Sequence, residues 1–536
     1  MANKNILLIE PGYKNKYPPL GLMKLAAYHG PYGKRDNVRF IKGDKDKSVY
    51  KVNWDRVYVT TLFSFEWKEI SKSVDAAIEI ARGDTTKVFV GGIAASLMHD
   101  KFVAEPRWRG VRFIAGLLSG SPTESLQLDD FAEELYSDDF NGTPIEDLVP
   151  DYSILEQIKD QYVYPVHDAY FAYASRGCVR KCHFCGVPKL EGDQRDAQSI
   201  TGLIKAIAER HGEKRDLMLM DNNVVASSNY KNIIAEIRDN GFHRGAVFRR
   251  PGKPPVQRRV DFNQGVDARI LCKDKMYLEE MATIAIRPLR IAFDHLGVRK
   301  AYEQAIHMAH DVGLADLSNY MLYNFVDTPS DLYERMHINI DLNEKLNIRI
   351  FSFPMRYQPT DLPDRSYVSE HWNRYYLRSM QIILQATHGV VSGAPKFFRR
   401  AFGEDKQEFE ELLLRPQHFL FNRFWYEEFD GKPEFEEFKS EFKGLSKDER
   451  HELATLLSGN DSRLLPSTFA GLIGKANSAK VNRILSYYVP IPKEKEEQIW
   501  KAQRQRAQEA KLSLALTDES IPEDELVEDA GLAEAA

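Results

Sequence analysis

Alternating strand-like and helix-like segments constrain the fold of this chain more than any other feature. Between residues 169 and 360, short apolar runs alternate with amphipathic, helix-forming runs. The strand-like runs lie at 169–175, 216–223, 260–270, 288–297, 319–329 and 348–359. Strands that alternate with helices form parallel sheets. Six such units predict a partial (β/α)6 TIM-like barrel, with ligands at the C-terminal ends of its strands.

The same alternation is present at the N-terminus of the chain. Apolar runs at 5–10, 37–43, 56–64 and 87–96 have strand character, and residues 66–83 have helical apolar spacing. This arrangement is typical of α/β proteins with a parallel sheet that is covered by helices on both faces. We expect a Rossmann-like, doubly wound domain over residues 1–120.

The rest of the chain has a different pattern. Residues 121–168 are acidic and weakly patterned, which predicts a linker with a helix or two. Residues 361–500 are rich in helix formers and aromatics, which predicts a helical C-terminal domain. Residues 501–536 contain no aromatic residue and end in an acidic run, so we predict a disordered acidic tail.

Composition excludes several classes of protein. The chain starts without a signal-peptide pattern and has no apolar run near the ~20 residues of a membrane span. Three of its four cysteines are clustered, which is not a disulfide framework. We therefore expect a cytoplasmic protein with reduced thiols and no membrane partner. The net charge of −6 gives no global attraction to nucleic acid.

The clustered cysteines follow the first strand of the predicted barrel. Cys178, Cys182 and Cys185 have the spacing C-x3-C-x2-C. A structural zinc site needs four ligands, and the only candidates for a fourth are His183 and the distant Cys272. Iron–sulfur cubanes are also normally held by four cysteines. Three thiolates would leave one iron open as a reaction site.

This spacing, Phe184 directly before the last cysteine, and the position after the first of six strands resemble the radical S-adenosylmethionine (SAM) superfamily over residues 169–360. The resemblance implies that the three cysteines hold a 4Fe-4S cluster whose open iron binds the amino and carboxylate groups of SAM. One-electron cleavage of SAM then yields a 5′-deoxyadenosyl radical that modifies an unactivated carbon. Phe184 would lie against the adenine. The expected partner is a flavodoxin- or ferredoxin-like electron donor.

Other polar residues on the predicted strand ends are candidates for contacts with SAM. The family's second strand ends in a motif that receives the methionine amino group, and Asp221, Asn222 and Asn223 stand there. The alternative is a capping cluster before the next helix. Arg269, on the third predicted strand, pairs either with the SAM carboxylate or with Asp267, two residues away on the same strand face.

The N-terminal segment resembles the cobalamin-binding-type domain that precedes the radical SAM barrel in one large subgroup. Pro18–Gly21, Thr60–Leu62 and Gly91–Gly92 match that domain in order and spacing over residues 1–120. The loop 11–21 lacks the histidine that ligates cobalt in classical cobalamin domains. Two alternatives follow: cobalamin bound without a protein cobalt ligand, or a scaffold that has lost it.

The sequence therefore predicts a radical SAM enzyme, with cobalamin-dependent methyl transfer as one outcome. The substrate is unknown. The rival hypothesis is a zinc-stabilised nucleic-acid-binding module that uses the arginine-rich, proline-rich loop 248–260. We favour a solvated charge run for that loop over contact with phosphates, so nucleic acid is the less favoured partner.

Overall fold

The computed structural model describes residues 3–119, 143–459, 469–489 and 491–516. They form two compact units. The first comprises the chain up to Tyr320 together with Tyr357–Tyr367, and the second comprises Met321–Arg356 and the chain from Val368 onward. The division falls inside the stretch 169–360 that the sequence predicts as one barrel.

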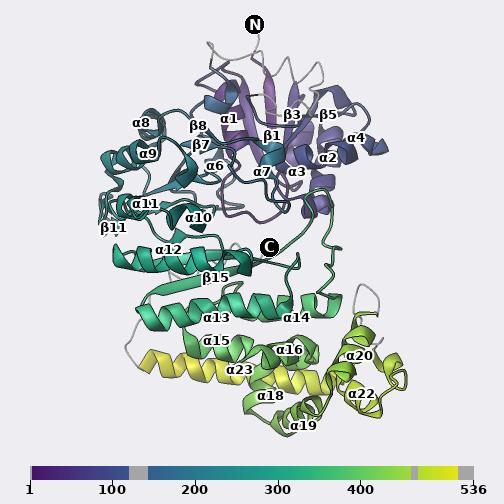
Figure 1. Cartoon of the computed structure of the whole chain (residues 1–536). Coiled ribbons are helices and arrows are strands. Elements are labelled where there is room, and N and C mark those ends of the chain that lie inside the picture. Colours follow the sequence, from purple (N-terminus) through teal and green to yellow (C-terminus); the bar gives the residue numbers. More distant parts are fainter. Residues whose placement is uncertain (1–2, 120–142, 460–468, 490, 517–536) are drawn as a thin grey trace. The chain divides into compact units, whose positions relative to one another are not determined.

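A five-stranded parallel sheet forms the N-terminal part of the first unit (Figure 1). Its strands are β1 (Asn5–Glu10), β2 (Asn37–Lys42), β3 (Arg56–Thr61), β4 (Val88–Gly92) and β5 (Arg112–Phe113). Their order is β2-β1-β3-β4-β5, and each neighbouring pair is parallel. The predicted mixed α/β class with a parallel sheet is confirmed.

Helices cover both faces of this sheet. On one face, Ile70 and Val74 of α2 (Trp67–Ile80) share a buried apolar cluster with Val57 of β3. On the other face, His29 at the end of α1 (Leu20–His29) contacts the next residue of β3, with 3.0 Å from its Nε2 to the Tyr58 hydroxyl. Neighbouring residues of a strand point to opposite faces, so α1 and α2 lie on opposite sides of the sheet.

The buried His29 makes the stability of the sheet sensitive to acid. Burial lowers the pKa of His29 to about 4, whereas an unfolded histidine titrates near 6.5. The unfolded chain therefore binds a proton first, and stability falls as pH drops from about 6.5 toward 4. We expect a loss of roughly 2 kcal/mol between pH 7 and pH 5. Urea unfolding of wild type and His29→Gln at both pH values measures it, and equal losses in both proteins would contradict the assignment.

All six strands predicted between residues 169 and 360 are present, in two three-stranded sheets of order β12-β9-β6 and β13-β14-β15. The strands are β6 (Ala169–Ala172), β9 (Asp216–Leu219), β12 (Val260–Asp261), β13 (Leu289–Arg290), β14 (Asp316–Tyr323) and β15 (Arg349–Arg356). Parallel bridges from Val260 to Ile286 and from Val266 to Ile291 link the segments of β12 and β13. The strands thus follow one another in chain order.

Helices separate these strands as predicted. They are α8 (Ile200–His211), α9 (Tyr230–Ile237), α11 (Met276–Met281), α12 (Arg299–Asp311) and α13 (Pro329–Leu346). Periodic apolar residues explain their positions: in α8, for example, Ile200, Ile204 and Ile207 are buried.

The third and fourth strands are much shorter than the predicted 260–270 and 288–297, and those bounds were wrong. In the third strand, pairing with β9 ends at Asp261, and Asn263 takes a left-handed backbone with φ of 52°. Beyond it, Val266 makes a single bridge to Ile291. Asp267 then caps the short helix α10 (Ala268–Leu271) by accepting a hydrogen bond from the Arg269 backbone nitrogen. Arg269 therefore lies in a helical turn and not on a strand face.

The predicted linker and tail are only partly described. Residues 121–142 lie outside the described residues, and the segment that follows contains the short helical turns η5 (Ile145–Asp147) and α6 (Ser153–Glu156). At the other end, α23 (Lys493–Leu516) extends through the first part of the predicted tail. The acidic residues 517–536 lie outside the described residues.

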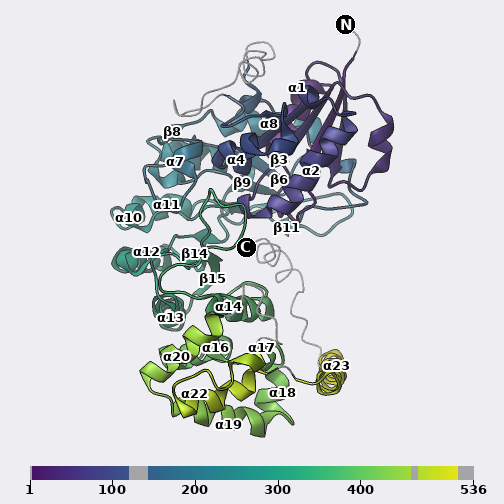
Figure 2. The ribbon, with the colours of Figure 1, turned by 90° about the vertical axis from the view of Figure 1, so that its right-hand side faces the viewer.

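Most of the second unit after Val368 is helical. Figure 2 shows these helices gathered together, with α23 seen end-on beside α18. Their apolar core includes Phe419, Tyr426 and Phe438, all buried. None of the helices in the described part of the chain is long and apolar enough to cross a membrane. The helices are α14 (Arg374–Ala386), α15 (Pro395–Phe402), α16 (Lys406–Leu414), α17 (Gln417–Phe421), α18 (Arg423–Glu428), α19 (Lys432–Lys443), α20 (Lys447–Ser458), α22 (Ala479–Ile484) and α23.

Candidate cofactor site

The cysteine loop starts from a short antiparallel pair at the end of β6. Strand β7 (Ser175–Arg176) pairs with β8 (Arg195–Asp196), and the three cysteines lie between them, ahead of the helical turn α7 (Val187–Leu190). All three thiols are free and half-buried. Phe184 is half-buried beside them. The loop follows the C-terminal end of the first strand of the array, which is where parallel α/β sheets place ligands.

Neighbouring thiols affect the ionisation of Cys182 and Cys185. Burial, the charge of Asp294 and the charge of Cys178 raise the pKa of Cys182. Burial, followed by Cys182 and Cys178, raises the pKa of Cys185 to about 11. Backbone amides point at the sulfurs: Arg180 N donates to Cys178 Sγ and Val187 N to Cys185 Sγ, both at 3.4 Å. A positively charged metal centre would offset the mutual repulsion of the thiolates.

The described residues give no support to a single-ion site at these thiols. Zinc binds each sulfur at about 2.3 Å, so its ligands crowd around one point. The described residues contain no group of three or more His, Cys, Asp or Glu side chains arranged to hold one metal ion. The zinc-stabilised alternative is therefore not supported. A four-iron cluster is wider than one ion, and its cysteines bind different irons.

Asp221, the first of the predicted SAM-binding residues, holds the base of the cysteine loop. Its carboxylate accepts hydrogen bonds from the Ala174 nitrogen at 2.9 Å and from the Ser175 nitrogen and hydroxyl at 2.5 and 2.7 Å. The side chain is buried, which raises its pKa to about 6. Asp221 thus joins the end of β9 to the start of the loop.

The two asparagines that follow also contact protein groups. Asn222 donates to Glu191 at 3.0 Å, and the buried Asn223 accepts from the Asp267 nitrogen at 3.4 Å. Each therefore links the end of β9 to a neighbouring loop. These hydrogen bonds do not test whether Asp221, Asn222 or Asn223 contacts SAM. Their role toward SAM stays a prediction.

Asp267 forms an ionic link between the cysteine loop and Arg269. Its carboxylate accepts a hydrogen bond from Arg180 Nε at 2.6 Å. It also accepts hydrogen bonds from Arg269 Nε and Nη2 at 2.8 and 3.1 Å. The predicted salt bridge between Asp267 and Arg269 is therefore present, although in a helical turn. The Arg269 side chain is 42% exposed, and its positive charge opposes the rise in the pKa of Cys182.

Gly177 is required for the loop to turn into its first cysteine. Its φ is +72°, and a Cβ there would lie 2.1 Å from the Asp193 carbonyl oxygen. We expect Gly177→Ala to displace the loop and to lower iron retention at least tenfold, while Gly202→Ala, with nothing within 4 Å of its Cβ, keeps iron content unchanged. Iron analysis after anaerobic reconstitution measures this, and full iron in Gly177→Ala would contradict it.

Sequence reasoning missed three residues that flank the loop. Glu191 accepts the Gly177 nitrogen at 2.9 Å and Arg176 Nη1 at 3.2 Å. Arg176 also pairs with Glu146, from the predicted linker. The sequence signal was an arginine two residues before the first cysteine and an acid six residues after the last. Their pairing joins segments too far apart in sequence for local patterns to reveal.

A cavity of about 320 Å³ lies along the C-terminal edge of the five-stranded sheet. Three stretches that the sequence singled out, Pro18–Gly21, Thr60–Leu62 and Gly91–Gly92, come together in its wall. Tyr173 and Met220, from the ends of β6 and β9, line it as well. The cavity therefore extends from the N-terminal sheet to the base of the cysteine loop, within the first unit.

Gly92 on β4 lets the backbone pass close to β3 in this wall. Gly92 has a φ of +106°, and a Cβ there would lie 2.3 Å from the Thr61 carbonyl oxygen. The described residues that line the cavity include no histidine. Any cobalamin held there would receive no histidine cobalt ligand from this wall, as the loop 11–21 already implied.

The basic loop 248–260 lies at the other ends of the strands. Arg250 pairs with Asp168 at 2.5 Å, directly before β6, and Arg259 with Asp216 at 3.5 Å, the first residue of β9. Arg258 pairs with Glu213. Parallel strands start at a common edge, so this loop borders their N-terminal ends, opposite the cysteines. Acidic side chains pair with three of its arginines, Arg250, Arg258 and Arg259.

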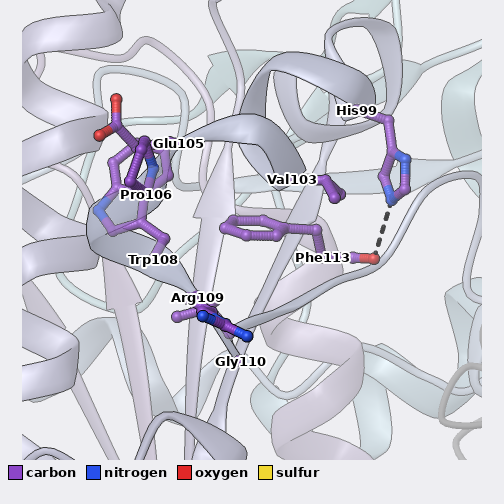
Figure 3. A pocket seen from close by; sticks show the side chains of 9 residues that line it. His99, Val103, Glu105, Pro106, Trp108, Arg109, Gly110 and Phe113 are labelled. Carbon is purple, nitrogen blue, oxygen red and sulfur yellow. Dashed lines mark hydrogen bonds between the residues drawn. The ribbon is translucent and has the colours of Figure 1, made fainter.

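A larger hollow of about 580 Å³ lies on the N-terminal sheet, between α4 (His99–Ala104) and β5. Figure 3 shows Phe113 between Trp108 and His99, with His99 Nε2 3.2 Å from the Phe113 carbonyl oxygen. Its lining contains none of the predicted site residues. It is therefore not the candidate site.

Comparison with known proteins gives structural likeness only. No family model and no curated protein matches this chain. It is similar to TsrM from Kitasatospora setae, solved with cobalamin and a 4Fe-4S cluster bound, with a TM-score of 0.43 and 15% identity over 67% of this chain and 74% of TsrM. TsrM is a radical S-adenosylmethionine methyltransferase.

The chain is also similar to SuiB from Streptococcus suis. The SuiB structure bound to SAM gives a TM-score of 0.26 and 12% identity over 41% of this chain and 44% of SuiB. The SuiB structure bound to the precursor peptide SuiA gives a TM-score of 0.29 and 12% identity over 48% of this chain and 59% of SuiB. This chain therefore spans less than two thirds of SuiB. Because every TM-score is below 0.5, the function of this chain is argued from its own residues.

Proposed function

We propose that this chain is a radical SAM enzyme in which Cys178, Cys182 and Cys185 hold a 4Fe-4S cluster. The observation that carries the proposal is three free, half-buried thiols on one loop after the first of six strands, with Cys178 and Cys182 both near enough to raise the pKa of Cys185. When bound, such a cluster supplies the electron that cleaves SAM and starts a reaction at an unactivated carbon.

The residues around the loop have distinct proposed roles. Asp267 holds Arg180 and Arg269 in place, and Arg269 offers its outer guanidinium N–H groups to the SAM carboxylate. Asn222 and Asn223 remain candidates for the methionine amino group, and Phe184 for the adenine. Asp221 positions the loop through its three hydrogen bonds.

We further propose that the chain consists of a doubly wound N-terminal domain, a partial (β/α)6 barrel and a helical C-terminal domain. The parallel order of the first sheet and the chain order of the six later strands support this division. We also propose that a flavodoxin- or ferredoxin-like electron donor approaches the cysteine loop on its exposed side, where Val179 is 49% exposed.

The cavity at the sheet edge is proposed to hold part of a cobalamin, with methyl transfer as the reaction. Two features support this: Pro18–Gly21 and Gly91–Gly92 line the cavity, and Tyr173 and Arg176 line it next to the cysteine loop. The protein, reconstituted anaerobically with hydroxocobalamin and desalted, should retain corrinoid absorption bands. A parallel sample with flavin mononucleotide should retain none. Loss of the corrinoid bands would reject cobalamin and leave the cluster proposal standing.

Metal content tests the cluster directly. Protein purified without oxygen should be brown and contain about four irons per chain after reconstitution. Zinc in place of iron would overturn the proposed function.

A further inference from the structure

A row of alternating charges runs along the cavity wall. Its members, which we call the ion-pair row, are Lys24, Glu146, Arg176 and Glu191, and all four line the cavity. Their side chains are 8%, 14%, 11% and 13% exposed, in that order. Charges so well shielded from water interact more strongly than surface pairs.

One end of the ion-pair row belongs to the N-terminal sheet. Lys24 is on α1, which packs on that sheet, and its Nζ lies 2.7 Å from Glu146 Oε1. The same carboxylate oxygen accepts Arg176 Nη2. Burial would raise the pKa of Glu146, but the charges of Lys24 and Arg176 hold it below its usual value. Glu146 is therefore an anion held between two cations.

The other end is attached to the cysteine loop. Arg176 Nη1 lies 3.2 Å from Glu191 Oε1, and the other Glu191 oxygen accepts the Gly177 backbone nitrogen at 2.9 Å. Gly177 directly precedes Cys178. The Arg176 guanidinium also lies 3.3 Å from the centre of the Tyr173 ring, which fixes its orientation.

A ligand in the cavity would touch both ends of this row. Lys24 and Leu25 line the cavity from α1, and Arg176 and Glu191 line it from the flanks of the cysteine loop. Each charge in the row has a neighbour of opposite sign, so moving one member leaves the next one unpaired in a poorly hydrated place, which is costly. The row therefore has the rigidity needed to transmit a displacement.

We propose that the ion-pair row couples the cavity to the cysteine loop, with Arg176 as the positioning residue that sets the loop in response to what the cavity holds. The inference rests on the proposed function, since it takes the loop as the cofactor loop. A cavity ligand that favours one arrangement of the ion-pair row would raise the affinity of the cysteine loop for its cofactor. By reciprocity, a cofactor bound to the loop would raise the affinity of the cavity for that ligand by the same factor.

Hydrogen exchange of the full, cluster-free chain tests the coupling. Lys24 contacts Glu146 and lies on α1, outside the loop. We expect Lys24→Met to speed exchange in the segment 173–186 about fivefold or more, the lower range of measured couplings between sites. Lys24→Arg keeps the cation and should restore the wild-type rate. Arg258→Met removes another well-buried cation, at the opposite strand ends, and should leave the segment unchanged.

Two further measurements separate coupling from local stability. Glu146→Gln keeps nearly the same side-chain shape and should speed exchange in the segment 173–186 as Lys24→Met does. It serves as the replacement test if the Lys24→Met protein does not fold. In the iron-loaded protein, Arg176→Lys should shift the electron paramagnetic resonance signal of the reduced cluster at unchanged iron content. Wild-type exchange in both Lys24→Met and Glu146→Gln would overturn the inference. The exchange experiment uses no iron, so its failure is distinct from failure of the cluster proposal.

Discussion

Cys182→Ala should lose the bound iron and, with it, all measurable SAM cleavage. Two cysteines remain in that variant, and a cubane held by only two protein ligands has two exposed irons. Cys182 is the middle ligand of the loop, and its charge interacts with Cys178 and, in turn, with Cys185. We expect iron below one tenth of the wild-type content after reconstitution, measured by metal analysis and by absorption of the anaerobic protein.

Cys272→Ala is the matched control for that experiment. Cys272 is also free and half-buried, but it ends α10 and lies outside the loop. This variant should keep iron and activity. Equal iron in Cys182→Ala and wild type, or equal losses in the two variants, would contradict the assignment of the three loop cysteines as the ligand set.

Arg290→Met should strongly destabilise the strand array. Arg290 on β13 bonds both oxygens of Asp261 on β12, at 2.9 and 2.8 Å, and its side chain is 1% exposed. Removing the cation leaves the Asp261 carboxylate unpaired in the interior, which costs about 3–5 kcal/mol. Urea unfolding followed by circular dichroism measures the loss.

The double variant Arg290→Met, Asp261→Leu is the control for an unpaired charge. It removes both partners, so it should recover more than half of the loss, although the hydrogen bond from the Asn263 nitrogen to Asp261 is also gone. A single-variant loss below about 1 kcal/mol, typical of a surface pair, would show that this ion pair is not what joins β12 to β13.

Much of the fold was predictable because buried strands and amphipathic helices leave local patterns. β1 contains the continuous apolar run 6–9, β3 has three consecutive buried residues at 57–59, and α8 repeats its buried isoleucines at helical spacing. The third strand of the array was overestimated because residues 262–270 also read as extended. The left-handed Asn263 and the Asp267 cap end the strand early, and neither leaves an apolar signal.

The candidate site was predictable only where its residues are adjacent in sequence. The three cysteines and Phe184 lie within one loop, whereas the fold brings Arg176 into contact with Glu146 and Glu191. The acidic partners of the basic loop, Asp168, Glu213 and Asp216, were missed for the same reason, because they lie far before the loop in the sequence. Long-range ion pairs have no periodicity that a single sequence can reveal.

Formation of 5′-deoxyadenosine tests the central claim most directly. The reconstituted protein, reduced with dithionite in the presence of SAM, should release 5′-deoxyadenosine and methionine, detected by liquid chromatography and mass spectrometry. The Cys182→Ala variant should release neither. An iron-loaded wild-type protein that leaves SAM intact under these conditions, or a Cys182→Ala variant that cleaves it as fast as wild type, would contradict the account.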